Sequence, residues 1–256
     1  MPISFDEVLS AFTLFAAPFL RLSGMMVVAP IFSAPGISIR TRALLAVLLA
    51  ALVAPSLPAP PFENIFSVRG LAAGVTELGV GLIIGFTLQL AFAAAVFAAQ
   101  AQSMTMGLGF AMAVDPQNGV QVPVIAQMFV ILITLLFLSV DGHLALIAAV
   151  VTSYDFIPIG ALGISQVVFS RVVALGSLVF TWGVLMALPV LTALLFINIS
   201  LGVVTRAAPQ LNIFAVGFPV TILSGLLIMF IVMPVYVDVM TSLIEIMTDE
   251  SLRTLR

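Results

Sequence analysis

The chain has 256 residues, of which 62% are hydrophobic and only 7% are charged, whereas about a quarter of an ordinary soluble domain is charged. Its positive charge comes from arginine alone, and so few charged side chains cannot cover a water-facing surface. The composition therefore excludes a soluble enzyme, the scattered charges exclude nucleic-acid binding, and we expect an all-α, polytopic integral membrane protein.

The first half of the chain predicts three apolar helices. Residues 9–31 are long enough for one membrane span, and the shorter apolar run 43–57 ends in proline-rich sequence that cannot continue a helix. Residues 70–99 form a third run, which as one helix would measure ~45 Å against a hydrocarbon core of ~30 Å. Residues 100–123 combine methionines and glycines with Asp-Pro-Gln-Asn-Gly, which predicts an irregular loop or a broken helix.

The second half begins with a predicted span at 124–140, followed by a short re-entrant or interfacial piece at 144–151. Residues 172–204 carry no charge and are too many for one straight span. We expect Pro189 and Asn198 to divide this run, because proline removes a helical hydrogen bond and clashes with the preceding turn.

Residues 213–237 predict a last span that contains two prolines, and the charged residues after Asp249 predict a short, amphipathic and solvated helix. No linker separates these pieces, so residues 1–256 are predicted to form a single membrane-embedded domain. The over-long apolar runs favour broken or hairpin helices that pack against other protein, since lipid alone does not require such lengths.

Two charged residues lie inside apolar runs. An unpaired charge at membrane depth costs at least ~2.5 kcal/mol, so Arg21 and Glu77 are expected to be paired or to face an interior. They could pair with each other or with a partner subunit, and a side chain near a helix end could instead reach the interface. Gly81 and Gly85, which follow Glu77, form a small-xxx-small pattern that permits close helix contact.

Asp141 and His143 are the residues that most resemble a catalytic pair, because an imidazole near a carboxylate can act as a general base. They stand at the end of a predicted span, where a polar cap is the ordinary interpretation, and the chain has no Gly-x-Ser-x-Gly nucleophile motif. With one histidine and no cysteine in the chain, we expect no catalytic residue, no metal site and no cofactor.

The methionines between residues 104 and 112 allow two interpretations. Methionine is flexible and unbranched, so these side chains could fill a core or form a deformable seal around an object of variable shape. Gly107 and Gly109 add weight to the seal, because irregular backbone at membrane depth persists where it is buried or lines a cavity.

The chain resembles the FliR family, a membrane component of the flagellar type III protein export gate, over essentially its whole length. The resemblance is carried by Arg21, Pro30, Arg42, Glu77 with the glycines after it, MGLGFAMAVDPQNGVQVP (106–123), FLSVDGHL (137–144), LPVLTALLFINISLGVVTRAAPQLNIF (188–214) and VGFPV (216–220).

The resemblance implies a non-enzymatic subunit that assembles with FliP-like and FliQ-like partners into a hetero-oligomeric helical complex with a closed pore. That complex would lie in the bacterial inner membrane, partly above it, at the flagellar basal body. Unfolded export substrates would pass through the pore, with FlhA and FlhB as further membrane partners and membrane lipid around the assembly. The alternatives are an injectisome export-gate subunit and a small-molecule secondary transporter.

The resemblance also implies a pore plug in the glycine- and methionine-bearing segment: Met104, Met106, Gly107, Gly109, Phe110, Met112 and Asp115. A second set of residues is assigned to intramembrane polar contacts or assembly, because its members interrupt apolar stretches and can satisfy freed backbone groups. This set is Arg21, Glu77, Arg206, Gln210 and Asn212.

Overall fold

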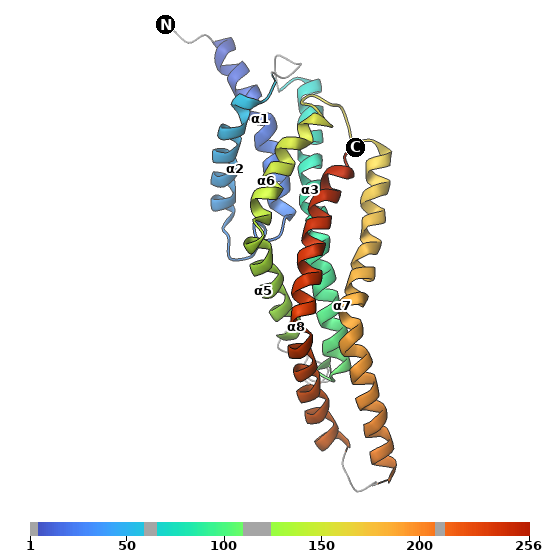
Figure 1. The fold of residues 1–256 in the computed structure, drawn as a ribbon. Coiled ribbons are helices and arrows are strands. Elements are labelled where there is room, and N and C mark those ends of the chain that lie inside the picture. The colour runs from blue at the N-terminus through green and yellow to red at the C-terminus, as the bar shows by residue number, and fades with distance from the viewer. Residues whose placement is uncertain (1–4, 59–65, 110–123, 208–212) are drawn as a thin grey trace. The chain divides into compact units, whose positions relative to one another are not determined.

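The computed structural model describes residues 5–58, 66–109, 124–207 and 213–256, and every regular element in these ranges is a helix (Figure 1). The elements are α1 (Phe5–Val28), α2 (Ile39–Val53), the 3-10 helix η1 (Ala54–Ser56), α3 (Val68–Thr105), α5 (Val124–Ser139), α6 (Gly142–Thr152), the 3-10 helix η3 (Ser153–Asp155), α7 (Gln166–Ala207) and α8 (Ile213–Arg253).

The lengths and apolar composition of these helices confirm the prediction of an all-α polytopic membrane protein. Within the described ranges, four helices are long and apolar enough to cross a bilayer: α2 extended to Ser56, α3, α7 and α8. A fifth span results if α5 and α6 count as one broken helix, since they meet at an angle of 66°.

The chain divides into two compact units, each built from separate stretches of sequence. The first unit comprises Met1–Leu90, Phe137–Gly176 and Ile244–Arg256, and the second comprises Ala91–Leu136 and Ser177–Leu243. Helices α3, α5, α7 and α8 each contribute residues to both units. The two units therefore share continuous helices.

In the first unit, α1 contacts α2, α3 and α6, and its crossing with α3 is unusually close. A Cβ added at Gly81 would overlap the carbonyl oxygen of Arg21, and one at Gly85 would lie 2.6 Å from the carbonyl oxygen of Met25. On the opposite helix, a Cβ at Gly24 would overlap the carbonyl of Leu78. The close contact predicted for Gly81 and Gly85 is therefore confirmed.

In the second unit, the last turns of α3 contact α7 and α8, and α8 contacts α5. The Gln102 amide donates hydrogen bonds to the Met186 carbonyl oxygen, at 3.3 Å, and to the Tyr236 hydroxyl, at 2.9 Å. The Tyr236 ring also meets the buried Phe129 ring edge-on, with centroids 5.0 Å apart. This core is held by neutral hydrogen bonds and aromatic packing.

The prediction that Pro189 and Asn198 divide the run 172–204 was wrong, because α7 is one helix of 42 residues. A proline inside an apolar helix is tolerated where local adjustment and neighbouring groups satisfy the freed backbone carbonyl. Residues 100–105 were likewise expected in a loop or a broken helix, and they form the last turns of α3.

The separate solvated tail helix was also a wrong prediction. Helix α8 continues through Pro219 and Pro234 to Arg253 without a break. Met247, Ser251 and Leu255 are buried, each four residues from the next, so this end of α8 presents one face to the first unit. Charge density alone could not indicate that face.

We predict that Gly81→Ala destabilises the protein by about 1–3 kcal/mol, because the new methyl group meets the backbone of α1, which cannot rotate away as a side chain can. Thermal unfolding of the detergent-extracted protein measures the effect. Gly176→Ala is the matched control, since an added Cβ there meets no described atom within 4 Å. If the Gly81→Ala protein unfolds at the same temperature as the control, α1 and α3 do not cross this closely.

Candidate functional site

Arg21 is fully buried, and it lies where α1 crosses α3. Its Nε atom is 2.6 Å from Oε2 of Glu77, whose side chain is 3% exposed. An ion pair with so little water is stabilising only if its remaining hydrogen-bonding groups also find partners. The groups around the guanidinium therefore decide how much this ion pair contributes to the stability of the fold.

The other two nitrogens of Arg21 are both satisfied by the segment that follows α6. Nη1 donates to the Ser153 hydroxyl and Nη2 to the carbonyl oxygen of Ile157, each at 2.8 Å. Ser153 in turn donates to the Val150 carbonyl oxygen, and the Arg21 Cζ atom lies 3.7 Å from the centre of the Tyr154 ring. One guanidinium thus joins α1 to α3 and to η3.

The connection from η3 to α7 is fixed to α3 at a second point. The backbone N–H of Gly163 donates to the Thr76 hydroxyl at 2.8 Å, beside Glu77 in the chain. Gly163 has φ of +85°, a left-handed conformation that side-chain-bearing residues rarely adopt. The connection is therefore anchored at two points, by Arg21 of α1 at Ile157 and by the Thr76 hydroxyl of α3 at Gly163.

The sequence left several possible partners for Arg21 and Glu77. In the structure these two residues pair with each other. Their predicted role in assembly stays a prediction. Sequence reasoning missed Thr76, Ser153 and Tyr154. Their polar character was only a weak indication of a site, because polar residues next to apolar runs are common at helix ends.

Gly107 ends α3 in the second unit. It has φ of +88°, and the N–H groups of Gly107 and Leu108 donate to the carbonyl oxygens of Met104 and Ser103, the hydrogen-bond pattern of a Schellman C-cap. A Cβ at Gly107 would lie 2.7 Å from the Phe218 ring, so both the conformation and the space require glycine. The helix-breaking effect expected of this glycine is thus observed.

The methionines beside Gly107 have opposite environments. Met106 is fully buried against Gly225, and its carbonyl oxygen accepts a 3.0 Å hydrogen bond from the Thr221 hydroxyl. Met104 is 62% exposed, and a Cβ at Gly109 would lie 3.4 Å from its sulfur. Met106 therefore fills the core of the second unit in this conformation, whereas Met104 is available to other groups.

Several predicted site residues lie neither at the Arg21–Glu77 ion pair nor at the turn that ends α3. Arg206 is exposed in the last turn of α7, in the second unit. The remaining members of the predicted plug and assembly sets lie outside the described residues: Phe110, Met112, Asp115, Gln210 and Asn212.

Asp141 and His143 lie at the start of α6, where Asp141 is the N-cap residue. Asp141 takes the left-handed conformation, φ 55°, and its side chain makes no capping hydrogen bond. Its carbonyl oxygen instead accepts from the N–H groups of Leu144 and Ala145, which starts α6. No described group hydrogen-bonds to the buried Nδ1 atom of His143. Asp141 is therefore the N-cap residue of α6, and it caps the helix through its backbone carbonyl.

No metal centre accompanies these residues. Across the ranges that the structure describes, no three His, Cys, Asp or Glu side chains come together as metal ligands. The Arg21 site joins three segments of the first unit, and the turn at Gly107 ends α3 beside an exposed methionine.

The chain is similar to known bacterial proteins over nearly its full length. A family model described as "Bacterial export proteins, family 1" matches residues 12–247. The flagellar biosynthetic protein FliR of Escherichia coli (strain K12) is 38% identical over 234 residues, which cover 91% of this chain and 89% of that protein. Proteins of the same name from Pectobacterium carotovorum and Bacillus subtilis are 40% and 28% identical over 85% and 98% of the chain, and 83% and 97% of theirs.

We predict that Arg21→Met destabilises the protein by about 3–5 kcal/mol, because it leaves the Glu77 carboxylate buried without a partner. The double variant Arg21→Met/Glu77→Met should recover most of that loss, since it removes both charges and keeps apolar volume. Thermal unfolding in detergent measures both. Arg69→Met, at an exposed arginine of α3, is the control. Equal melting temperatures of Arg21→Met and this control would contradict the prediction.

Proposed function

The chain belongs to the FliR family of bacterial export proteins, and on that premise we propose that it is a membrane subunit of a flagellar type III protein export gate. The observation that carries the proposal is the similarity, over 91% of the chain, to a flagellar biosynthetic protein. Such a subunit needs no chemistry of its own. It has to assemble, bound a path for an unfolded polypeptide and keep that path closed at rest.

The surfaces of the apolar helices support a role inside a larger assembly. In α3, 67% of the most apolar window is buried, whereas in α2, α7 and α8 the buried share is 17%, 22% and 22%. The last three helices therefore leave long apolar faces for lipid or for other subunits. We assign these faces to FliP-like and FliQ-like subunits in the bacterial inner membrane at the flagellar basal body, with FlhA and FlhB as further partners.

The end of α3 supports a plug. The Schellman turn at Gly107 ends α3, and the exposed Met104 presents a flexible thioether beside that turn. A resting gate must stop ions and yet pass chains of any sequence, so its seal cannot be a rigid and specific fit. Thioethers on glycine-broken backbone meet both needs. We assign the seal to this segment, including Phe110, Met112 and Asp115.

A secondary transporter is the competing function, because it would also contain broken helices and intramembrane charge. The buried charges of this chain are used within the first unit, where Arg21 meets Glu77, Ser153 and Ile157. That favours a structural use of the charges over a solute site. The flagellar names of the relatives favour a flagellar gate over an injectisome gate.

We predict that the chain is unstable when produced alone and is rescued by co-expression with FliP-like and FliQ-like subunits, because its apolar faces then have partners. Detergent extraction followed by co-purification and native mass measurement tests this. A stable, monodisperse monomer obtained without those subunits, or solute transport by the purified chain alone, would contradict the gate.

We predict that deletion of Gly107–Ala111 leaves the assembly intact but makes it leaky, because the flexible seal is shortened. The measurement is ion conductance or small-solute entry in cells that produce the variant, with assembly checked by co-purification. Deletion of Ala59–Glu63, an equally long piece of the proline-rich connection, is the control. If the Gly107–Ala111 deletion assembles and is no more permeable than wild type, the methionines of this segment fill a core and do not form a seal.

A further inference from the structure

Arg42 of α2 is a charged residue that neither the ion pair at Arg21 nor the plug uses. Its Nη2 atom donates to the carbonyl oxygen of Ala34 at 2.9 Å. Its Nε atom, by contrast, is shut off from solvent and has no hydrogen-bond partner among the described residues. A charged donor left unmet away from water is unfavourable. The Nε–H group of Arg42 therefore requires an acceptor from beyond the described part of the chain.

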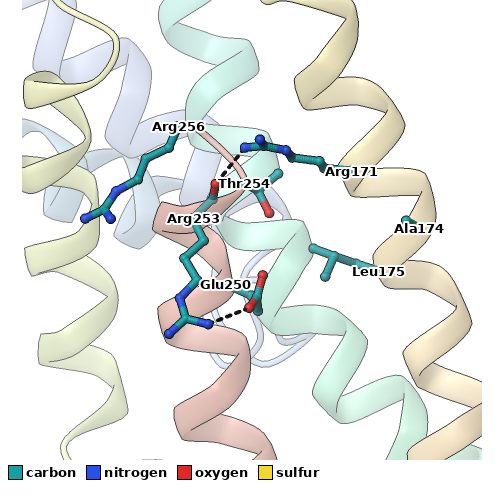
Figure 2. A pocket seen from close by; sticks show the side chains of 7 residues that line it. All are labelled: Arg171, Ala174, Leu175, Glu250, Arg253, Thr254 and Arg256. Carbon is teal, nitrogen blue, oxygen red and sulfur yellow. Dashed lines mark hydrogen bonds and ion pairs between the residues drawn. The ribbon is translucent and has the colours of Figure 1, made fainter.

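No carboxylate that the structure describes neutralises Arg42. The described residues form two ion pairs, one at Arg21 and one at Arg253, whose guanidinium lies 3.2 Å from Glu250 (Figure 2). Residues 8–58, which contain α2 and most of α1, include three arginines but neither Asp nor Glu. Arg42 also lies one turn from the N-terminus of α2, where the helix dipole favours a negative charge. The missing acceptor is therefore expected to be an anion.

Arg42 lines a cavity of about 150 Å³ between α1 and α2, in the first unit. Ser23 of α1 lines the cavity too, and its hydroxyl has no hydrogen-bond partner among the described residues, whereas the Thr13 hydroxyl of the same helix donates to the Leu9 carbonyl oxygen. The other lining side chains are apolar: Phe19, Met26, Val27, Ile39, Ala43 and Ala46. The cavity thus combines an apolar wall with two polar groups that lack partners.

The size of the cavity fits one large apolar side chain, because about 150 Å³ is the volume in which a protein cavity holds a benzene-sized group. Val27 and Ile39, which line it, are 61% and 80% exposed, so a group from outside can reach it. An acyl chain would fill the space but would offer no acceptor to Arg42 or Ser23. A carboxylate beside a leucine- or phenylalanine-sized side chain satisfies both the polar groups and the apolar wall.

We propose that this cavity receives an acidic residue and a neighbouring apolar side chain from a helix of an adjacent gate subunit. The inference rests on the proposed function, because it takes the other gate subunits as the partners. The carboxylate accepts hydrogen bonds from the Arg42 Nε–H group and from the Ser23 hydroxyl, and the apolar side chain packs against Phe19. Arginine suits this contact, because its rigid guanidinium binds carboxylates while Nη2 stays on Ala34.

The first test measures the apparent Kd of this chain for the rest of the assembly, by dilution and native mass spectrometry of the detergent-extracted complex made with FliP-like and FliQ-like subunits. Arg42→Gln should raise this Kd about tenfold, the effect of losing one hydrogen bond to a charged group. Ala43→Phe, which fills the cavity from an exposed position, should raise it as well. Arg40→Gln, an equal charge change at an exposed residue of α2 outside the cavity, should leave the Kd unchanged.

The second test identifies the group that enters the cavity. The photo-crosslinker p-benzoylphenylalanine replaces Val27, the co-produced assembly is irradiated, and the crosslinked peptide is sequenced. We expect a peptide of another subunit, with an Asp or Glu within one helical turn of the crosslinked residue. Exchanging the charges, by combining Arg42→Glu with an arginine in place of that acidic residue, should then restore the wild-type Kd. A purely structural role of Arg42 within α2 would not be restored in this way.

Equal Kd values for Arg42→Gln and Arg40→Gln would overturn the proposal, and so would crosslinks from position 27 only to lipid or only to a second copy of this chain. A rise of the Kd in Glu63→Gln as large as that in Arg42→Gln would assign the acceptor to this chain and overturn the proposal too. A wild-type chain that forms no assembly would contradict the proposed function itself. Variants that fail to differ within an assembly that does form would contradict only this inference.

Discussion

The Arg21 guanidinium lies in a part of the first unit from which water is excluded, so each of its donors needs an acceptor supplied by the protein. Those acceptors come from α3, from η3 and from Ile157 beyond it. Helix α1 can therefore pack only where all three meet, and the glycines at its crossing with α3 allow the required approach. Removing one partner lowers the stability by more than the intact pair contributes to it, because a charge then stays buried alone.

The second unit is organised differently, since the buried polar contacts among its described residues are neutral. Gln102, Tyr236 and Thr221 satisfy backbone and hydroxyl groups around the end of α3. Such contacts are individually weaker than a buried ion pair and less costly to rearrange. The seal that we propose for the segment after α3 would be better attached through contacts of this kind.

The apolar runs and the intramembrane charges were readable from the sequence, because a helix in lipid must be apolar and a charge there must be paired. Pro189 of α7 was misread, since propensity rules derived for water ignore how an apolar helix resatisfies a freed carbonyl. Ser153 was missed because its role depends on a long-range contact with Arg21, 132 residues earlier in the chain. Asp141 was assigned to a cap, but the sequence could not indicate that it caps α6 through its backbone carbonyl.

That separation in sequence also constrains the order in which the protein can mature. Arg21 is synthesised early, but Glu77 follows 56 residues later and Ile157 follows 136 residues later. During translation the first helix thus emerges with a charge whose acceptors do not yet exist, at a cost of ~2.5 kcal/mol or more if it enters lipid by itself. Its final position is settled only after more than half of the chain has been made, so a ribosome stalled before Ile157 would hold an N-terminal helix that is not yet committed to the membrane.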